Sequence, residues 1–385
     1  MTLYDFDPAA FLREYWQKKV ALIRNPWGSW TNPLAPDELA GLACEEEVES
    51  RLIMRGPGGW TLEHGPFEEA RFEQLPAKDW TLLVQAVDHH VPEVAALIDP
   101  FRFIPNWRID DVMVSYASDG GSAGPHFDQY DVFLIQGLGK RKWQIGGRCD
   151  DSSEILPDQD MRLLAKFEAE EEWVLEAGDI LYVPPGIAHY GMAVGDDCMT
   201  YSVGFRSPST SDLVAGWTEH LLARLPEDER YRDPDLTIQE NPGEIAKSAI
   251  ARLHMMMTER MTDKQGFARW FGEYSSHPKY PDVDWSPARS VGVDEVRDSI
   301  ARAVPLVRSP ASRYSYLPQT DDLILLFVDG QSFECGGESA AFARRLCAQV
   351  RIHLDPDLAQ SAAILELVEI LVNQGSVAFD EEAGE

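Results

Sequence analysis

The sequence predicts a mainly β domain, followed by a helical segment and a small α+β domain. Residues 1–210 contain short apolar runs bounded by turn residues, which is the pattern of a mostly antiparallel barrel or sandwich. Residues 211–290 repeat apolar side chains every three or four positions, as an amphipathic helix does. Residues 291–385 hold three further strand patterns and end in two helical ones. We therefore expect domain boundaries near residues 210 and 290.

Several runs of strand character lie in the first domain. They are rich in β-branched and aromatic residues and read VMVSYA, YDVFLIQG, KRKWQIG, WVLEAG, DILYVP and MTYSVGF. Gly, Pro and Asp residues between the runs mark turns. Helices are expected before these strands, over FDPAAFLREYW, PDELAGLA and WTLLVQAVDHH.

The helical segment has an apolar stripe formed by Ala246, Ile250, Leu253, Met257 and Met261. Three consecutive methionines within it leave apolar surface on more than one face. Methionine packs adaptably, so the stripe fits either a core or a subunit interface. Because the segment follows a complete barrel and would otherwise lack a partner, we favour a homodimer interface.

The last part of the chain predicts a module of winged-helix size. The strands SRYSYL, LILLFV and QSFEC come first, with the turn Asp329-Gly330 before the last of them, and helices follow near 339–350 and 359–373. Winged-helix modules often bind DNA, but the last 34 residues carry eight acidic side chains and no Lys or Arg. We therefore expect an acidic, winged-helix-like domain at 291–385 that contacts protein and binds no nucleic acid directly.

The bulk composition is that of a globular protein. A chain of 385 residues with 44% hydrophobic residues has room for two or three domains. Its five cysteines lie far apart with no CxxC pair, which argues against a disulfide framework and a cysteine zinc site. The amino-terminal residues lack the pattern of a secretion signal, and no long uncharged apolar window occurs. We expect a cytoplasmic protein with no membrane segment.

The formal net charge of −31 restricts the partners. Such a charge repels phosphate backbones and anionic lipids, so nucleic acid and membrane surfaces are disfavoured. A basic partner would be attracted. The alternative is an acidic surface that only aids solubility.

A candidate metal site begins in the stretch GPHFDQYDVFLIQGLGKRKW, residues 124–143. If His126 and Asp128 lie in a strand, their side chains share one face, because alternate residues of a strand do so. His189 in the stretch GDILYVPPGIAH supplies a third ligand, and the spacing within this stretch is that of the second motif of the cupin barrels. Two histidines and one aspartate form the facial triad of non-haem Fe(II) oxygenases, which leaves about three positions open.

Arg141 is a candidate cosubstrate residue. It lies on the strand after the turn at 137–139, and Lys140 and Lys142 alternate away from it, so that a single guanidinium points into the barrel. A buried guanidinium needs a carboxylate partner. The partner that we propose is the distal carboxylate of 2-oxoglutarate, whose 2-oxo acid end can chelate iron through two oxygens. The fork of the arginine side chain suits bidentate pairing.

The stretches GPHFDQYDVFLIQGLGKRKW, EAGDILYVPPGIAHYG and YSVGFR closely resemble the Jumonji-type (JmjC) 2-oxoglutarate oxygenases of the bacterial ribosomal oxygenase family, the ribosomal protein arginine hydroxylases. FLREYWQKK, LAPDELAGLA, HGPFEEA, WTLLVQAVDHH and NWRIDDVMVSY also look like that family. The resemblance covers all of the first domain. The helical dimerisation segment and the acidic winged-helix-like end match more loosely.

The resemblance implies a cupin-like double-stranded β-helix and hydroxylation of an arginine β-carbon in a large-subunit ribosomal protein, the sixteenth, with release of succinate and carbon dioxide. Its cofactors are Fe(II), 2-oxoglutarate and O2. His126, Asp128 and His189 match the iron ligands, and no other catalytic residue is implied. Arg141 matches the cation that binds 2-oxoglutarate, and Ser115 matches a hydroxyl near it.

A basic ribosomal protein is the partner that the resemblance implies. Asp119, in the loop before the triad, has a carboxylate that can pair with the target guanidinium. Further carboxylates at the expected barrel mouth come from Asp110, Asp111 and Asp131.

One departure and two alternatives remain. Four residues after His189 the cupin pattern usually has Asn, and this chain has Ala193. One alternative keeps the oxygenase chemistry but directs it at another protein residue, such as histidine, or at a small molecule. The other is a non-catalytic cupin-type binding protein with a structural metal. Arg141 argues against this reading, because a structural metal site has no need of a buried cation.

Overall fold

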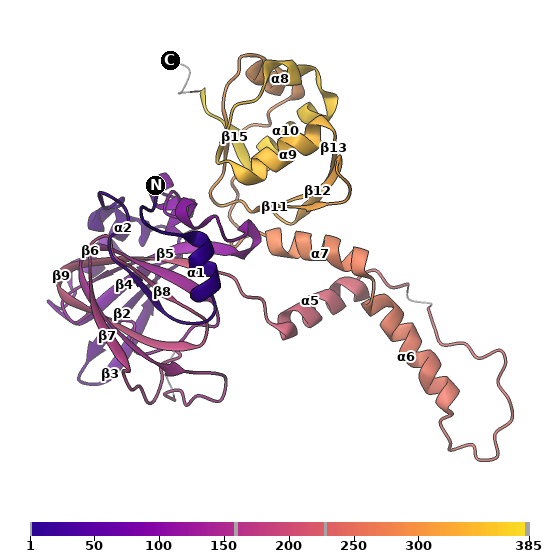
Figure 1. Cartoon of the computed structure of the whole chain (residues 1–385), viewed down its shortest axis with the longest axis horizontal. Helices are drawn as coiled ribbons and strands as arrows, with labels where there is room; N and C mark the ends of the chain where they lie inside the picture. The colour runs from indigo at the N-terminus through magenta and orange to yellow at the C-terminus, as the bar shows by residue number, and fades with distance from the viewer. Residues whose placement is uncertain (1, 158–160, 227–228, 382–385) are drawn as a thin grey trace. The chain divides into compact units, whose positions relative to one another are not determined.

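The computed structural model describes residues 2–157, 161–226 and 229–381 (Figure 1). The chain divides into two compact units. Unit 1 comprises residues 1–207, 278–313 and 350–385, and unit 2 comprises residues 208–277 and 314–349. No helix in these described ranges is long and apolar enough to cross a membrane.

The amino-terminal part of unit 1 is built on a nine-stranded sheet with the order β1-β8-β6-β9-β5-β4-β2-β3, and β7 pairs with β6 (Figure 1). The pairs are antiparallel, as the alternating apolar runs predict. The strands are β1 (Ala21–Ile23), β2 (Ser50–Gly56), β3 (Gly59–His64), β4 (Trp80–Val84), β5 (Ile109–Ala117), β6 (Asp131–Arg148), β7 (Glu171–Glu176), β8 (Ile180–Val183) and β9 (Ile187–Phe205). The predicted mainly β fold class is confirmed.

Strands β6 and β9 are long, and each serves two parts of the sheet. The carboxyl-terminal half of β9 pairs with the first half of β6 and with β5, and the amino-terminal half of β9 pairs with the second half of β6. The register between them shifts around Leu138. At this shift Gly139 has a φ of +60°, and a Cβ there would lie 2.7 Å from the carbonyl oxygen of Asp197. The irregularity therefore requires glycine.

The shift in register also changes which side chains of β6 face the barrel interior. Before it, Val132 and Leu134 pack into a core with Leu181 and Val183, whereas Phe133 and Ile135 pack on the other side. After it, Trp143 and Ile145 join the same core as Val132. The inward face thus passes from even-numbered to odd-numbered residues, which turns Arg141 inward.

Short helices cover the outer face of the sheet. The structure confirms two of the helices predicted at the amino terminus, and Asp7 caps the first by accepting hydrogen bonds from the backbone of Ala9 and Ala10. The α-helices of this part are α1 (Pro8–Glu14), α2 (Pro36–Leu42), α3 (Glu69–Glu73) and α4 (Pro92–Ala95), and the 3₁₀ helices are η1 (Val87–His89), η2 (Asp99–Phe101) and η3 (Asn106–Arg108).

The helix predicted over WTLLVQAVDHH is wrong. Residues Trp80–Val84 form strand β4, which pairs with β2 and β5 in the interior of the sheet, and a 3₁₀ turn follows. Because both faces of β4 are covered, its side chains form a continuous apolar run, which periodicity cannot separate from a buried helix.

The remaining elements of unit 1 are short. They are α8 (Val293–Ala301), β10 (Leu306–Arg308), β14 (Arg351–Ile352), η4 (Pro356–Gln360), α10 (Ala362–Asn373) and β15 (Val377–Phe379), with the strands in the order β14-β10-β15. Helix α10 confirms the helix predicted near residues 359–373.

Unit 2 contains the helical segment and a three-stranded sheet. Its elements are α5 (Thr210–Leu222), α6 (Lys247–Met261), α7 (Lys264–Ser276), β11 (Tyr314–Pro318), β12 (Leu323–Val328), β13 (Gln331–Gly336) and α9 (Glu338–Ala348). The predicted strands, the Asp329-Gly330 turn and the helix near 339–350 are confirmed. Glycine at 272 lets Phe327 of β12 lie against α7, because a Cβ there would come within 2.2 Å of its ring.

Helix α6 carries the apolar stripe on its surface. None of its residues is buried, and Leu253 and Met257 are 46% and 61% exposed. The alternative that these apolar side chains belong to the core of the single chain is therefore wrong.

Candidate metal centre

The loop before β6 positions the first two candidate ligands. Its residues 120–128 run antiparallel to the first half of β9: Gly120 N–H donates to the carbonyl of Ala193, and the backbones of His126 and His189 exchange two hydrogen bonds of 3.1 and 2.8 Å. Further along, Gly186 N–H donates to the Asp128 carbonyl. This pairing holds the HxD stretch against the strand that carries His189.

His126, Asp128 and His189 lie together at one point. One donor atom from each lies within 4.8 Å of the other two, and His189 Nε2 is 3.6 Å from Asp128 Oδ2. The strand predicted for the HxD stretch is wrong, since His126 makes only an isolated bridge and β6 begins at Asp131. The backbone is nevertheless extended enough there for both side chains to point the same way.

The two imidazoles have the same tautomer. His126 Nδ1 lies 2.9 Å from the carbonyl oxygen of Gly124, and His189 Nδ1 lies 3.0 Å from that of Ile187. A carbonyl oxygen only accepts, so each Nδ1 carries a proton, and in the neutral ring the lone pair then lies on Nε2. Burial, and then the nearby His126, lower the pKa of His189 to about 4. His189 is therefore neutral at pH 7, the form that binds a metal.

This donor set fits a divalent transition metal. Two neutral Nε2 atoms and one carboxylate match the 2-His-1-carboxylate triad, whereas calcium and magnesium prefer oxygen ligands only. Hydrogen bonds from the distal ring nitrogens to backbone carbonyls orient metal-binding histidines in this way. Three ligands on one side of an octahedral ion leave the opposite positions for other molecules.

Arg141 is a buried cation with an incomplete set of partners. It lies on β6 with 4% of its surface exposed. Its Nε donates to Cys198 Sγ at 3.4 Å, but Nη2 has no hydrogen-bond partner and the guanidinium no carboxylate among the described residues. A buried donor left unpaired costs about 1–3 kcal/mol, so it points to a ligand. The residues thus fit an acid such as 2-oxoglutarate.

Trp143 connects this arginine with the triad. The Arg141 guanidinium lies 5.8 Å from the Trp143 ring, and the same ring lies 5.9 Å from that of His189. The close approach requires glycine at 191, where a Cβ would lie 2.7 Å from the indole. The interpretation of the sequence missed both Trp143 and Cys198. Cys198 reaches Arg141 through a strand register that the sequence does not reveal, whereas Trp143 follows Arg141 by two residues on the same strand.

The two remaining predicted residues, Ser115 and Asp119, have polar contacts with other parts of the chain. Ser115 is buried on β5, where its hydroxyl lies 3.5 Å from the carbonyl of Thr200 on β9. Asp119 is partly exposed, accepts a hydrogen bond from Gly195 N–H and pairs with Lys78 at 2.6 Å. The hydrogen bond from Lys78 lowers the pKa of Asp119, which keeps its carboxylate charged.

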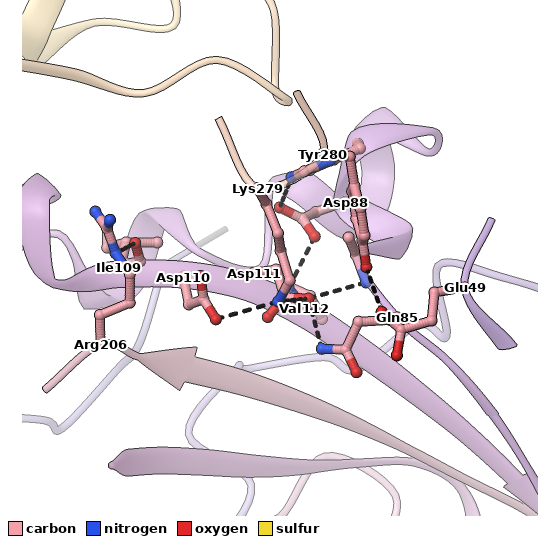
Figure 2. A network of polar contacts seen from close by, with 12 residues as sticks. Glu49, Gln85, Asp88, Ile109, Asp110, Asp111, Val112, Arg206, Lys279 and Tyr280 are labelled. Atoms are coloured by element: carbon pink, nitrogen blue, oxygen red, sulfur yellow. Dashed lines mark hydrogen bonds and ion pairs between the residues drawn. The ribbon is translucent and has the colours of Figure 1, made fainter. Parts of the chain in front are cut away.

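The other carboxylates expected at the barrel mouth are already paired. Lys279 Nζ lies 3.1 Å from Asp110 Oδ2 and 2.9 Å from Asp111 Oδ2, as Figure 2 shows. The amide of Gln85 also donates to Asp111, and Tyr280 donates to Glu49 (Figure 2). Burial opposes the charge of Lys279, but the two aspartates outweigh it and raise its pKa. This network ties residues 279–280 to strand β5.

Asp131 is also engaged. It is buried and accepts hydrogen bonds from Arg108, Tyr182 and Gln17.

Tyr130 is a residue near the triad that the sequence did not single out. Removal of its hydroxyl from water, and then the charge of Asp128, raise the pKa of Tyr130.

Comparisons with known proteins identify two domain families in this chain. Residues 96–213 match the JmjC domain family, and residues 259–378 match the ROXA-like winged helix family. The ribosomal protein uL16 3-hydroxylase of Escherichia coli strain K12 is 37% identical over 371 residues, which are 96% of this chain and 97% of that protein. This chain belongs to the JmjC ribosomal oxygenases.

Solved structures extend the match to the fold of these ribosomal oxygenases. The X-ray structure of E. coli YcfD covers 99% of this chain and 100% of that one with a TM-score of 0.89 and 35% identity. A structure of YcfD, a ribosomal oxygenase from E. coli, in complex with cobalt and 2-oxoglutarate gives a TM-score of 0.85 at 35% identity and covers 98% and 99% of the two chains. The predicted family and fold are confirmed.

Proposed function

We propose that this ribosomal oxygenase is an Fe(II)- and 2-oxoglutarate-dependent dioxygenase that hydroxylates the β-carbon of an arginine in the large-subunit ribosomal protein uL16. The proposed metal ligands are His126, Asp128 and His189, and Arg141 is the proposed partner of the distal carboxylate of 2-oxoglutarate. The observation that carries the proposal is the buried guanidinium of Arg141, which has no carboxylate partner among the described residues and is joined to the triad through Trp143. A purely structural metal site would not require it.

Fe(II), 2-oxoglutarate and O2 together supply the oxidation: one oxygen atom enters the C–H bond of the substrate, the other enters succinate, and carbon dioxide leaves. The protein supplies orientation. His126 and His189 present lone pairs because their Nδ1 protons are held by backbone carbonyls. Arg141 would hold the distal carboxylate of 2-oxoglutarate, which orients the 2-oxo acid end of the cosubstrate toward the metal ligands.

Selectivity for arginine must come from the way the target is held, because several C–H bonds of similar strength lie along any side chain. Asp119 is the proposed partner of the target guanidinium. Its present pair with Lys78 is an exposed ion pair that water screens, so an incoming guanidinium can replace the ammonium. The net charge of −31 favours encounter with a basic ribosomal protein at low salt.

Ser115 is proposed to lie near the bound cosubstrate. The support is its place on β5, two residues before Ala117, which pairs with Cys198 beside Arg141. Its hydroxyl bond to the Thr200 carbonyl is long at 3.5 Å, so the hydroxyl can turn toward another acceptor at little cost.

Mass spectrometry of ribosomal proteins from cells with and without this enzyme tests the proposal. We expect one added oxygen on an arginine of uL16 only when the enzyme is present. Purified enzyme should then oxidise a uL16 peptide with Arg at the target position and leave the matched Lys and Ala peptides unchanged. Equal oxidation of the Lys peptide, or oxidation of free small molecules alone, would refute the arginine assignment.

We also propose a cytoplasmic homodimer, organised as a catalytic domain at 1–210, a dimerisation domain at 211–290 and an acidic winged-helix-like domain at 291–385. The exposed apolar stripe of α6 supports the dimer, since Leu253 and Met257 lie in water in the single chain. A ribosomal protein substrate accounts for the cytoplasmic location.

A further inference from the structure

The surroundings of the Arg141 guanidinium are almost entirely apolar. In the sheet, Arg141 lies opposite Leu175 of β7 on one side and Ala193 of β9 on the other, and the Trp143 ring flanks it. None of these side chains offers a hydrogen-bond acceptor. Within the described residues, the one side-chain acceptor that reaches the guanidinium is the sulfur of Cys198, 3.4 Å from Nε.

Cys198 is itself held in place. It is fully buried in a small cluster with Ala117 and Ala193, and it pairs with Ala117 of β5 in the sheet. On its other side, Gln136 Nε2 lies 3.5 Å from Sγ, and that amide is fixed by bonds to the carbonyls of Leu138 and Met199. The sulfur therefore has little freedom to move away from Arg141.

A guanidinium is planar, so one fixed N–H group restricts the direction of the others. With Nε held by Cys198 and one face covered by Trp143, the Nη atoms are left as the ends that can meet a carboxylate. Nη2 is the buried atom that has no partner among the described residues. The arrangement orients the cation while its outer edge stays available.

The chemistry of sulfur suits this position. A thiol sulfur is a weak, uncharged acceptor, so it can orient the guanidinium without neutralising it. A carboxylate at position 198 would pair with Arg141 and compete with the cosubstrate. An alanine there would leave Nε without an acceptor and the side chain free to turn.

We infer that Cys198 is a positioning residue for the binding of 2-oxoglutarate, acting through Arg141. This inference rests on the proposed function, because it takes Arg141 as the partner of the distal carboxylate. Cys198 does not touch the reacting atoms; it sets the angle at which Arg141 meets the cosubstrate.

The test measures 2-oxoglutarate affinity by calorimetry on the full chain, with Co(II) in place of Fe(II) so that no turnover occurs. Cys198→Ala removes the acceptor, Cys198→Val removes it but fills the space, and Cys198→Ser keeps an acceptor. Since one hydrogen bond to a weak acceptor such as sulfur is worth about 0.5–1.5 kcal/mol, we expect Kd to rise roughly 3- to 10-fold for the Ala and Val variants, and less for Ser. The matched control, Cys335→Ala, removes a buried thiol in unit 2 and should leave Kd unchanged.

Two further readouts separate positioning from a general loss of structure. A 2-oxo acid without a distal carboxylate, 2-oxobutanoate, should bind Cys198→Ala as it binds the parent protein. In an Arg141→Met background, Cys198→Ala should have no additional effect on 2-oxoglutarate, because the residue through which it acts is gone. With Fe(II), the KM for 2-oxoglutarate should rise while kcat at saturation stays the same.

Unchanged affinity in both Cys198→Ala and Cys198→Val would overturn the inference, as would equal weakening of 2-oxobutanoate or an undiminished effect in the Arg141→Met background. Other outcomes would reject the proposed function itself. If the parent protein binds no 2-oxoglutarate, or if Arg141→Met binds it normally, the cosubstrate site lies elsewhere.

Discussion

Replacing Arg141 by methionine should make the protein more stable in the absence of cosubstrate and should remove its response to 2-oxoglutarate. These two effects have one cause. Arg141 is buried without a carboxylate partner among the described residues, so its charge is unfavourable until the cosubstrate arrives. Methionine is an unbranched side chain two bonds shorter than arginine, carries no charge and packs well against aromatic rings such as Trp143.

The expected gain in stability is modest. An unpaired buried donor costs about 1–3 kcal/mol, and the lost hydrogen bond to Cys198 offsets about 0.5–1 kcal/mol of that gain. The free energy of unfolding should therefore rise by about 1 kcal/mol, and by about 2.5 kcal/mol at most. The expected loss in binding is larger. Truncating one partner of a buried charge pair costs about 2–5 kcal/mol, which is roughly a 30-fold to several thousand-fold rise in Kd. Arg141→Lys keeps the charge but loses the planar guanidinium, so its Kd for 2-oxoglutarate should lie between those of the parent protein and Arg141→Met.

Urea unfolding followed by circular dichroism, with and without 2-oxoglutarate, measures both effects. At a concentration of 100 times the parent Kd, the ligand should stabilise the parent protein by about 2.7 kcal/mol and Arg141→Met by less than about 0.9 kcal/mol. Arg108→Met is the matched control, since Arg108 is also largely buried but pairs with Asp131 at 3.0 Å. This control should lower stability, because it leaves a buried carboxylate short of its cation.

Two results would refute the reasoning. If Arg141→Met were destabilised as strongly as Arg108→Met, the guanidinium of Arg141 would be satisfied within the chain. If Arg141→Met kept the stabilisation by 2-oxoglutarate, Arg141 would not be its partner.

Three further predictions concern the metal, pH and assembly. Asp128→Ala should lose Fe(II)-dependent turnover of 2-oxoglutarate, and full turnover measured as succinate would reject the triad. In the parent protein zinc should not support turnover, because zinc has no redox chemistry. Burial lowers the pKa of His89 to about 3 from 6.5, so the stability linked to it is complete above pH 6.5 and falls by about 1.4 kcal/mol per unit as pH drops toward 3. Unfolding of His89→Gln should depend less steeply on pH over that range, and an equal slope would contradict the assignment. Leu253→Glu should sediment as a monomer and the parent chain as a dimer; a monomeric parent would reject the interface.

The sequence predicted the parts of the fold that have a local signature. The strand of residues 323–328 and the capped helix at Asp7 follow from composition and turn chemistry alone. Strand β4 was mistaken for a helix because its environment, a neighbouring strand on each side, depends on residues 26–36 positions away in the chain. A local pattern cannot contain that information.

The candidate site was predictable only where residue type and spacing define it. His126, Asp128 and His189 follow a spacing that the sequence displays, although the HxD stretch is held by pairing with β9 and not by lying in a strand. Cys198 was missed for a different reason. Its contact with Arg141 depends on the register shift around Leu138 in the pairing of β6 with β9. Trp143 lies two residues after Arg141 on the same strand, so strand alternation alone could have placed it on the same face.

Two buried cations illustrate what structure adds to a list of charged residues. Lys279 lies between Asp110 and Asp111, and the two contacts satisfy its charge within the chain (Figure 2). Arg141 is buried, with 4% of its surface exposed. Within the described ranges, the one side chain that accepts a hydrogen bond from its guanidinium is the thiol of Cys198. In the sequence both are basic residues near acidic ones, and the partner of Lys279 is 169 positions distant.

A buried charge that the chain leaves unpaired implies a partner from outside, because the folded protein would otherwise carry an uncompensated cost. The same reasoning removes Asp110, Asp111 and Asp131 from the set of free carboxylates available to a basic substrate, since each already pairs with a cation of this chain. It leaves Asp119, whose exposed pair with Lys78 is weak enough to exchange. The distribution of satisfied and unsatisfied charges thus separates cations and anions that hold the fold from those that await a ligand.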